Sequence, residues 1–182
     1  METTKVVTGK VRFSYANVFE PKALNEGDTP KYSVCLLIPK SDTKTVDKIK
    51  KAIEAAKVAG KAVLADKNGK IPSTIKNPLR DGDDERGDDP AFEGMYFINA
   101  NSHRKPSIVD KDLEPIMSQE EFYSGCYGRA SLNFYAYNVQ SKGIAAGLNN
   151  LQKLEEGEPL AGGSTASEDF GGENAWEDDD MM

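Results

Sequence analysis

The sequence has few of the residues on which metal sites and nucleophilic active sites are built. Its 182 residues include one histidine, His103, and two cysteines, Cys35 and Cys126. One histidine without a neighbouring cysteine supports neither a zinc site nor a catalytic triad. Both cysteines lie in strand-like apolar patterns, which predicts two reduced, packed thiols in a cytoplasmic protein and leaves a disulfide as the alternative. We expect no cofactor.

Long apolar runs are missing, and so are cations near the C-terminus. No run approaches the roughly 20 residues of a membrane helix, and the first five residues contain no signal-type segment. No Lys or Arg follows Lys153, whereas ten of the 30 acidic residues do. Residues 1–154 therefore hold 20 acidic residues against 23 basic ones, although the whole chain has a net charge of −7. This division predicts a mildly basic body with an acidic tail, and no membrane partner.

Alternation in residues 129–138 predicts a strand with an unusual polar face. One side carries Arg129, Ser131, Asn133, Tyr135 and Tyr137, and the other side is apolar. A cation and two flat rings on an open sheet suit phosphates and stacked bases. The alternative is that the two tyrosines pack beneath a loop, and this strand alone does not decide between the two.

The remaining patterns favour a loop-rich β protein with one main helix. In the first strand, Val11, Phe13 and Tyr15 share one face, and Lys10 and Arg12 lie on the basic outer face. A helix is expected from Ser41 or Asp42 to about Ala59, with Gly60 as its stop. The predicted strands cover residues 10–19, 31–39, 94–102, 107–110, 129–138 and 142–148.

An acid-rich segment, residues 80–89, raises the question of a metal site. Its spacing fails the calcium-loop pattern, because Arg86 stands where the turn glycine belongs and Phe92 where the last carboxylate belongs. We interpret the segment as a solvated loop with internal Arg–Asp pairs. The alternative is a magnesium-dependent nuclease. Its candidate ligands are Asp81, Asp83, Asp84, Glu85, Asp88 and Asp89.

Several stretches together resemble one known family. They are residues 9–19, 30–34, 37–40, 78–83, 96–102, 123–129 and 142–150. Over about residues 5–160 the chain resembles a bacteriophage and prophage family long catalogued as a domain of unknown function, whose members are regarded as single-stranded-DNA-binding proteins with an OB-fold. The acidic tail resembles that of replicative single-strand binders, including those of T7-like phages.

The resemblance implies an OB-fold over residues 1–154, a five-stranded Greek-key barrel that is mostly β with one or two helices. It also implies sequence-tolerant binding of single-stranded DNA in phage replication or recombination, in the bacterial host cytoplasm. The resemblance names no contact residues. We predict them from the strand faces and the neighbouring loops. They are Lys10, Arg12, Lys31, Arg104, Lys105, Tyr123, Tyr127, Arg129, Tyr135 and Tyr137.

The tail, residues 155–182, is too polar to bury a core and is predicted to be disordered. We expect it to occupy the basic groove when DNA is absent and to recruit a polymerase, helicase or primase when DNA is bound. Its partner-binding end is expected at Trp176, Glu177, Asp178, Asp179 and Asp180. The alternatives are a tail that only solubilises the chain and a phage assembly or scaffold protein. A homodimer is left open.

Overall fold

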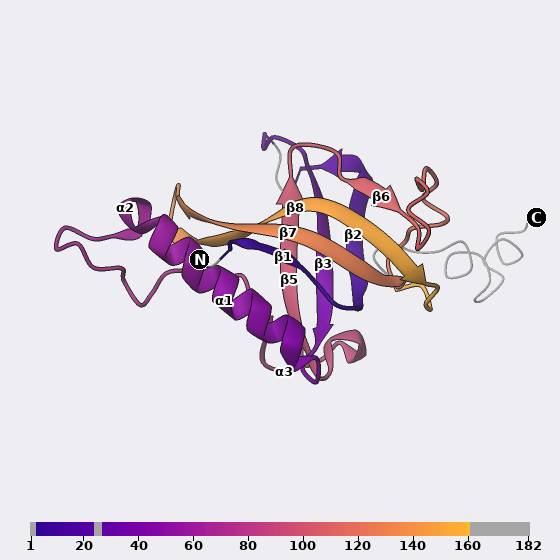
Figure 1. The fold of residues 1–182 in the computed structure, drawn as a ribbon, viewed down its shortest axis with the longest axis horizontal. Coiled ribbons are helices and arrows are strands. Elements are labelled where there is room, and N and C mark those ends of the chain that lie inside the picture. Colours follow the sequence, from indigo (N-terminus) through magenta and orange to yellow (C-terminus); the bar gives the residue numbers. More distant parts are fainter. Residues whose placement is uncertain (1–2, 24–26, 161–182) are drawn as a thin grey trace, which may run out of the picture.

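Five strands close into a barrel in the computed structural model, which describes residues 3–23 and 27–160 (Figure 1). They are β2 (Val11–Lys22), β3 (Lys31–Pro39), β5 (Met95–Ser102), β7 (Tyr127–Asn138) and β8 (Lys142–Glu155). The order is β7-β2-β3-β5-β8, and β8 pairs with β7 again to close the ring. Only the β5–β8 pair in this ring is parallel. This is the topology of an OB-fold, so the predicted fold class is confirmed.

Shorter elements extend this barrel. β1 (Lys5–Val7) pairs with β7, and β6 (Ser107–Val109) runs parallel to β8. The long connection between β3 and β5 carries α1 (Thr43–Ala59) and α2 (Lys61–Leu64). It then forms β4 (Arg80–Asp81), α3 (Gly82–Glu85) and η1 (Pro90–Phe92). None of the helices in the described ranges combines the length and the apolar character that a bilayer crossing requires.

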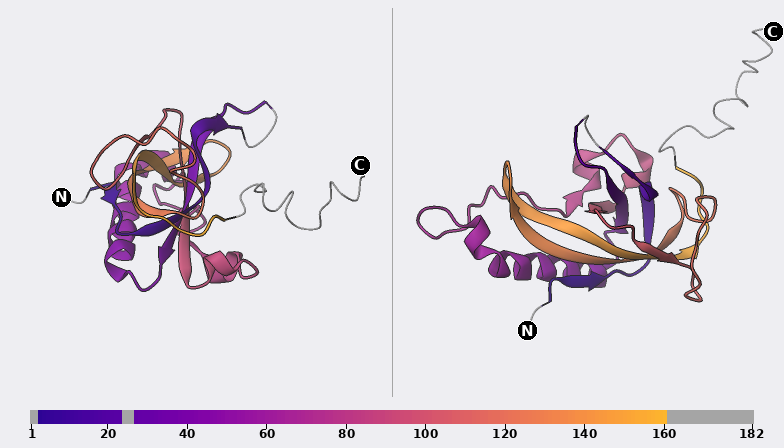
Figure 2. Two further views of the ribbon diagram at one scale, coloured as in Figure 1. Left: turned by 90° about the vertical axis from the view of Figure 1, so that its right-hand side faces the viewer. Right: turned by 90° about the horizontal axis from the view of Figure 1, so that it is seen from above.

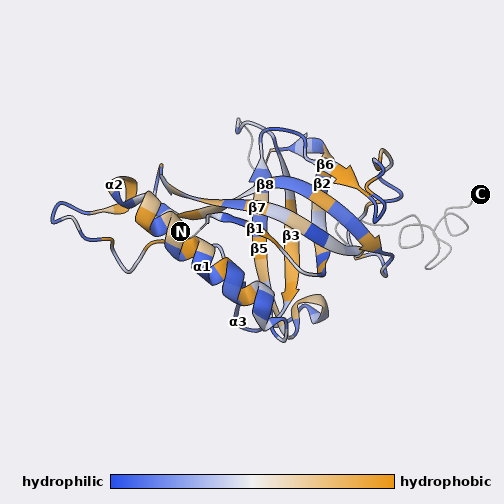
Figure 3. Ribbon diagram, in the orientation of Figure 1, coloured by the Kyte–Doolittle hydropathy of each residue, from blue (hydrophilic) through white to orange (hydrophobic). Residues whose placement is uncertain are grey.

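The barrel core follows the alternation of the strands. Val34, Leu36 and Ile38 point inward from β3 and are almost completely buried. α1 begins as expected, because the Asp42 carboxylate accepts a hydrogen bond from the Thr45 N–H at 3.2 Å. Apolar and polar bands alternate along α1 (Figure 3), and its apolar side joins the core against β1 and β7. The helix therefore covers one wall of the barrel.

The barrel has two walls with different surroundings. We call β1, β7 and β8, with α1 outside them, the front wall, and β2, β3 and β5 the back wall (Figure 2, right). The outer side of the back wall carries a second apolar cluster of Cys35, Leu37, Phe92 and Phe97. Leu37 and Phe97 are opposite each other in the register of β3 and β5, whereas Phe92 comes from η1. The acid-rich segment is therefore a packed cover over part of the back wall.

The acidic residues of this cover are paired with basic residues. One internal Arg–Asp pair of the expected kind is present, Arg86 with Asp89 at 3.6 Å, and Arg80 pairs with Glu85. A third cation comes from outside the segment, since Lys40 at the end of β3 pairs with Asp81 at 2.7 Å and with Asp83 at 2.8 Å. These hydrogen bonds from Lys40 hold the pKa values of both carboxyls below their usual range.

Both cysteines are buried, free thiols, as the sequence predicts. Burial raises the pKa of Cys35 to about 12 and also raises the pKa of Cys126. Since the thiolate is the reactive form, we expect neither thiol of the native protein to react with a thiol-specific reagent at pH 8. Counting reacted thiols before and after unfolding in urea checks this. Fast reaction of Cys35 in the native state would contradict the packing described for the back wall.

The folded body continues beyond residue 154, where the sequence places its end. β8 includes Glu155, and packed chain continues to Leu160 on the back-wall cluster. The rest of the predicted tail, including Trp176 and the acidic residues after it, lies outside the described residues. Leu160, the last described residue, therefore lies on the outer side of the back wall.

Candidate nucleic-acid interface

A bulge in β2 places a tyrosine on the outside of the back wall. The pairing of β2 with β3 shifts between Ser14 and Asn17, and Tyr15 has a left-handed φ of 46°. A bulge of this kind redirects a side chain. The Tyr15 ring is 40% exposed, and its hydroxyl accepts a hydrogen bond from Arg86 at 2.7 Å. The sequence-based assignment of Tyr15 to the face of Val11 and Phe13 is therefore wrong, because alternation does not continue through a bulge.

Arg86 connects this tyrosine to the apolar cluster. Its guanidinium lies 5.6 Å from the centre of the Tyr15 ring and 4.3 Å from that of the Phe92 ring. Such contacts are cation–π interactions, and they hold the guanidinium against aromatic surface. The hydrogen bond to Tyr15 raises the pKa of Arg86, so the group stays charged. A cation and an exposed ring thus stand side by side on the back wall.

A second group of predicted contact residues gathers at the edge of the same wall. Lys10 and Arg12 lie 5.7 and 5.3 Å from the centre of the Tyr127 ring. Arg12 also donates to Gly125 O at 3.0 Å and to Glu158 O at 2.7 Å, and Lys10 pairs with Glu155 at 2.9 Å. The last residue of β8 and the chain just after it therefore bind these two cations.

Tyr123 is held by the same segment of chain. Its hydroxyl donates to the Glu156 carboxylate at 2.7 Å and accepts from the Gly157 N–H at 3.0 Å. Burial, followed by the bond to Glu156, raises the pKa of Tyr123. Beside it runs a groove of about 260 Å³ between β2 and residues 119–124, lined by Asn17, Phe19, Phe122 and Tyr123 among others. This groove extends the polar and aromatic surface of the back wall upward along β2.

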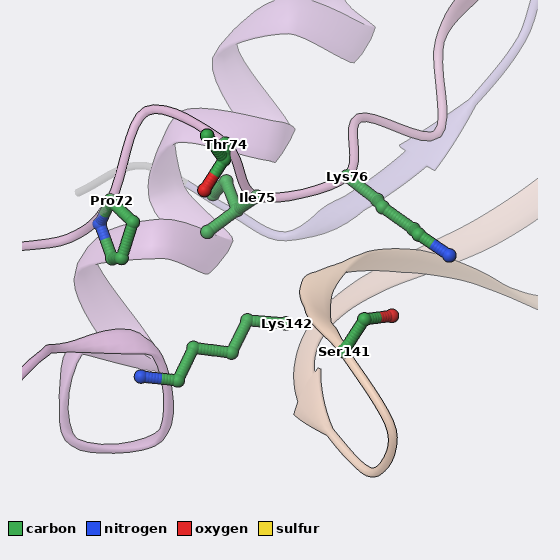
Figure 4. A pocket seen from close by; sticks show the side chains of 6 residues that line it. All are labelled: Pro72, Thr74, Ile75, Lys76, Ser141 and Lys142. Atoms are coloured by element: carbon green, nitrogen blue, oxygen red, sulfur yellow. The ribbon is translucent and has the colours of Figure 1, made fainter.

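A smaller cavity of about 200 Å³ lies elsewhere, where residues 72–76 meet the β7–β8 hairpin (Figure 4). Two lysines line it. Lys142 donates to Ala65 O at 3.1 Å, and the side chains of Lys76 and Lys142 extend in different directions. Because the two ammonium groups do not converge, the cavity does not form an anion site.

Comparison with known proteins gives this geometry a context. Residues 4–182 match the family described as "Enterobacter phage Enc34, ssDNA-binding protein". The chain belongs to this family. Protein p50 of Acyrthosiphon pisum secondary endosymbiont phage 1 is 32% identical over 190 aligned positions, which cover 98% of each chain. The predicted family resemblance is confirmed.

Solved structures of the Enc34 family support the fold. The single-stranded DNA-binding protein of bacteriophage Enc34, in complex with single-stranded DNA, is 28% identical with a TM-score of 0.74. That match covers 87% of this chain and 90% of the other. gp2.5, a single-stranded DNA-binding protein encoded by bacteriophage T7, shares the fold at 17% identity, with a TM-score of 0.62 and coverage of 91% and 99%.

The Enc34 family is a DNA-binding family and not an enzyme family, which sets the nuclease alternative aside. The acidic cluster agrees with this. Lys40 and Arg80 neutralise three of its carboxylates, those of Asp81, Asp83 and Glu85. Across the part of the chain that the structure describes, no three acidic, histidine or cysteine side chains come together as a metal site.

The other predicted contact residues fall into two further groups. Lys31, Arg104 and Lys105 lie at the upper end of the barrel, where β3 begins and β5 ends. Lys105 is 5.6 Å from the centre of the Phe19 ring, which places it above the groove beside β2. Their position fits the prediction, which stays untested.

Arg129, Tyr135 and Tyr137 lie on β7 in the front wall, and the structure does not bring them to the other groups. Arg129 donates to Thr8 O at 3.0 Å. Tyr135 is 43% exposed beside Gly147, and the Tyr137 ring lies over Gly143. Their predicted role in DNA binding is untested, and their place on the front wall, away from the other groups, argues against it.

Arg86 and Phe92 were missed as site residues by sequence reasoning. Arg86 is surrounded in the sequence by acidic residues, and no periodicity there indicates that it shares a surface with Phe92. Tyr15 was hidden by the apparent alternation of β2. The segment after β8 was assigned to the tail because its composition is polar.

Proposed function

We propose that this chain binds single-stranded DNA without regard to sequence, across the outer side of β2, β3 and β5. The observation that carries the proposal is the exposed Tyr15 ring fixed beside the Arg86 guanidinium, on the wall that OB-folds use for oligonucleotides. The solved relative from phage Enc34 in complex with single-stranded DNA supports the class of ligand.

The cations of this wall would contact phosphates. Arg12 and Arg86 lie on its outer side, and Lys31, Arg104 and Lys105 surround its upper end. Arginine and lysine neutralise phosphates and release condensed counterions. Rings add sequence-independent stacking, because every base has a flat apolar face. The two kinds of contact together give binding that tolerates any sequence.

The tail would act as a competing polyanion and as a docking segment for other proteins. It is covalently attached next to the proposed interface, so its effective concentration there is high. Its acidic residues would contact the same cations as DNA phosphates do. DNA, as the longer polyanion, would displace them. Once released, the end at residues 176–180 would recruit a replication protein in the host cytoplasm.

Affinity for a single strand should fall steeply with salt. If four cations each release one counterion, affinity drops about fiftyfold between 50 and 200 mM salt, since each contact adds roughly −0.7 to the logarithmic slope. Fluorescence anisotropy of a labelled oligo-dT measures this directly. A duplex of the same length is the matched control, and we expect it to bind much more weakly.

Deleting residues 161–182 should tighten binding at 50 mM salt and have little effect at 200 mM, because screening removes the competition. Absence of oligo-dT binding at 50 mM salt, by both the full chain and the tailless chain, would contradict the proposed function. A large, defined oligomer without DNA affinity would favour an assembly protein instead.

A further inference from the structure

The short segment that follows β8, residues 156–160, is seated on the body through its backbone; we call it the strap. The Gly157 N–H donates to the Tyr123 hydroxyl at 3.0 Å, and the Leu160 N–H donates to Ser124 O at 2.8 Å. Arg12 donates to the Glu158 carbonyl at 2.7 Å. All three contacts anchor the strap backbone to β2 and to the loop before β7, so the strap has one defined path.

This path depends on two glycines that touch. A Cβ atom placed on Gly157 would lie 1.9 Å from the Gly125 carbonyl oxygen, and one on Gly125 would lie 2.2 Å from the Glu158 carbonyl oxygen. Both obstacles are backbone atoms that cannot move aside. Gly125 also has a φ of 119°, which disfavours other residues, whereas Gly157 has no such restriction. A methyl group at residue 157 alone would therefore block seating without straining the free chain.

The strap ends on the apolar cluster of the back wall. Leu160 packs against the group of Cys35, Leu37, Phe92 and Phe97, whose exposed fractions range from 0 to 5%. Phe92 and Phe97 meet edge to face with ring centres 5.2 Å apart, and Arg86 covers Phe92. Strand outer faces are normally polar where they meet water. The outer face here is apolar and aromatic instead, and η1, Arg86 and Leu160 of the strap cover it together.

We propose that this cluster is a nucleobase subsite and that Leu160 fills it until DNA arrives. The inference rests on the proposed function and deepens it. A base offers what Leu160 offers, an apolar surface that packs against this cluster, and its phosphate would meet Arg12 and Arg86. When the strap lifts, Arg12 and Tyr123 lose their backbone partners in it and become available to the strand.

The strap and the acidic tail differ in how they respond to salt. The strap takes part through neutral backbone groups and Leu160, including the carbonyl that accepts from Arg12, and its printed ion pair is that of Glu156 with Lys153. Competition by the strap should therefore persist at 200 mM salt, whereas competition by the acidic tail should be screened. This difference separates the two effects in a single titration series.

The test is Gly157→Ala in the full chain, with Gly162→Ala as the matched glycine control outside the strap. A strap seated in about nine molecules of ten makes the apparent Kd for a strand about tenfold weaker than the intrinsic value. We expect G157A to bind labelled oligo-dT about tenfold more tightly at both salt concentrations, and G162A to match the unchanged protein. Unchanged affinity of G157A would overturn the proposal.

Hydrogen exchange gives a second readout that needs no substitution. The amides of Gly157 and Leu160 should exchange about tenfold more slowly than unprotected amides in the free protein, because the strap is seated in about nine molecules of ten. They should exchange at the unprotected rate when the protein is saturated with oligo-dT. Continued protection of both amides in the complex would show that the strap stays in place and would overturn the proposal. If no variant binds oligo-dT, including the chain without residues 161–182, the proposed function itself fails, which is a different result.

Discussion

Tyr15→Ala is expected to weaken binding of oligo-dT about fivefold to 150-fold. Loss of one stacked ring costs roughly 1–3 kcal/mol. The Tyr15 ring is 40% exposed on the back wall, and Arg86 holds it through its hydroxyl. Fluorescence anisotropy at 100 mM salt measures the change. Tyr15→Phe keeps the ring and removes only the bond to Arg86, so we expect it to retain most of the affinity.

The matched control for Tyr15 is Tyr135→Ala. The two tyrosines are almost equally exposed, at 40 and 43%, but Tyr135 stands on β7 in the front wall. The sequence favours Tyr135 as a contact because Tyr135 lies on the same strand face as Arg129. The barrel geometry favours Tyr15. We expect Tyr135→Ala to change affinity by less than about twofold. The reverse order of the two effects would place the strand on the front wall and contradict the proposed path.

How far the sequence predicts this structure depends on whether a feature is local. The helix cap at Asp42, the buried run of β3 and the alternation of β7 each follow from neighbouring residues, and all three are present. β1 was not predicted, because a strand of three residues has too little periodicity to be recognised. The same is true of α3 and η1, which form where loop residues meet β5.

The interface was harder to predict because it depends on contacts between distant segments. Arg86 reaches Tyr15 across 71 positions of sequence, and Tyr123 reaches Glu156 across 33. Alternation identified the two faces of β7 but could not say which wall of the closed barrel it joins. The side of a strand that faces the ligand is set by barrel closure, and one strand read alone does not contain that information.

Gly128→Ala is expected to destabilise the protein more than any other substitution considered, because Gly128 lies where the barrel closes. Gly128 lies in β7 where it pairs with both β2 and β8. A Cβ atom there would lie 1.8 Å from Gln152 O and 2.8 Å from the Gln152 carbonyl carbon, so a methyl group forces β7 and β8 apart. We expect a loss of about 3 kcal/mol in the free energy of unfolding, at the upper end for overpacking.

Urea unfolding followed by circular dichroism measures this loss as a lower midpoint, by about 1.5 M for a typical urea slope of about 2 kcal/mol/M. Gly147→Ala is the matched control on β8, because its nearest atoms are Asn133 O at 3.2 Å and Tyr135 Cε1 at 3.5 Å. We expect a loss of less than about 1 kcal/mol there, since contacts at these distances need shifts of only a few tenths of an ångström. Equal losses of unfolding free energy for the two variants would mean that β7 and β8 separate easily at Gly128. The pairing of β7 with β8 at that position would then not hold the barrel closed.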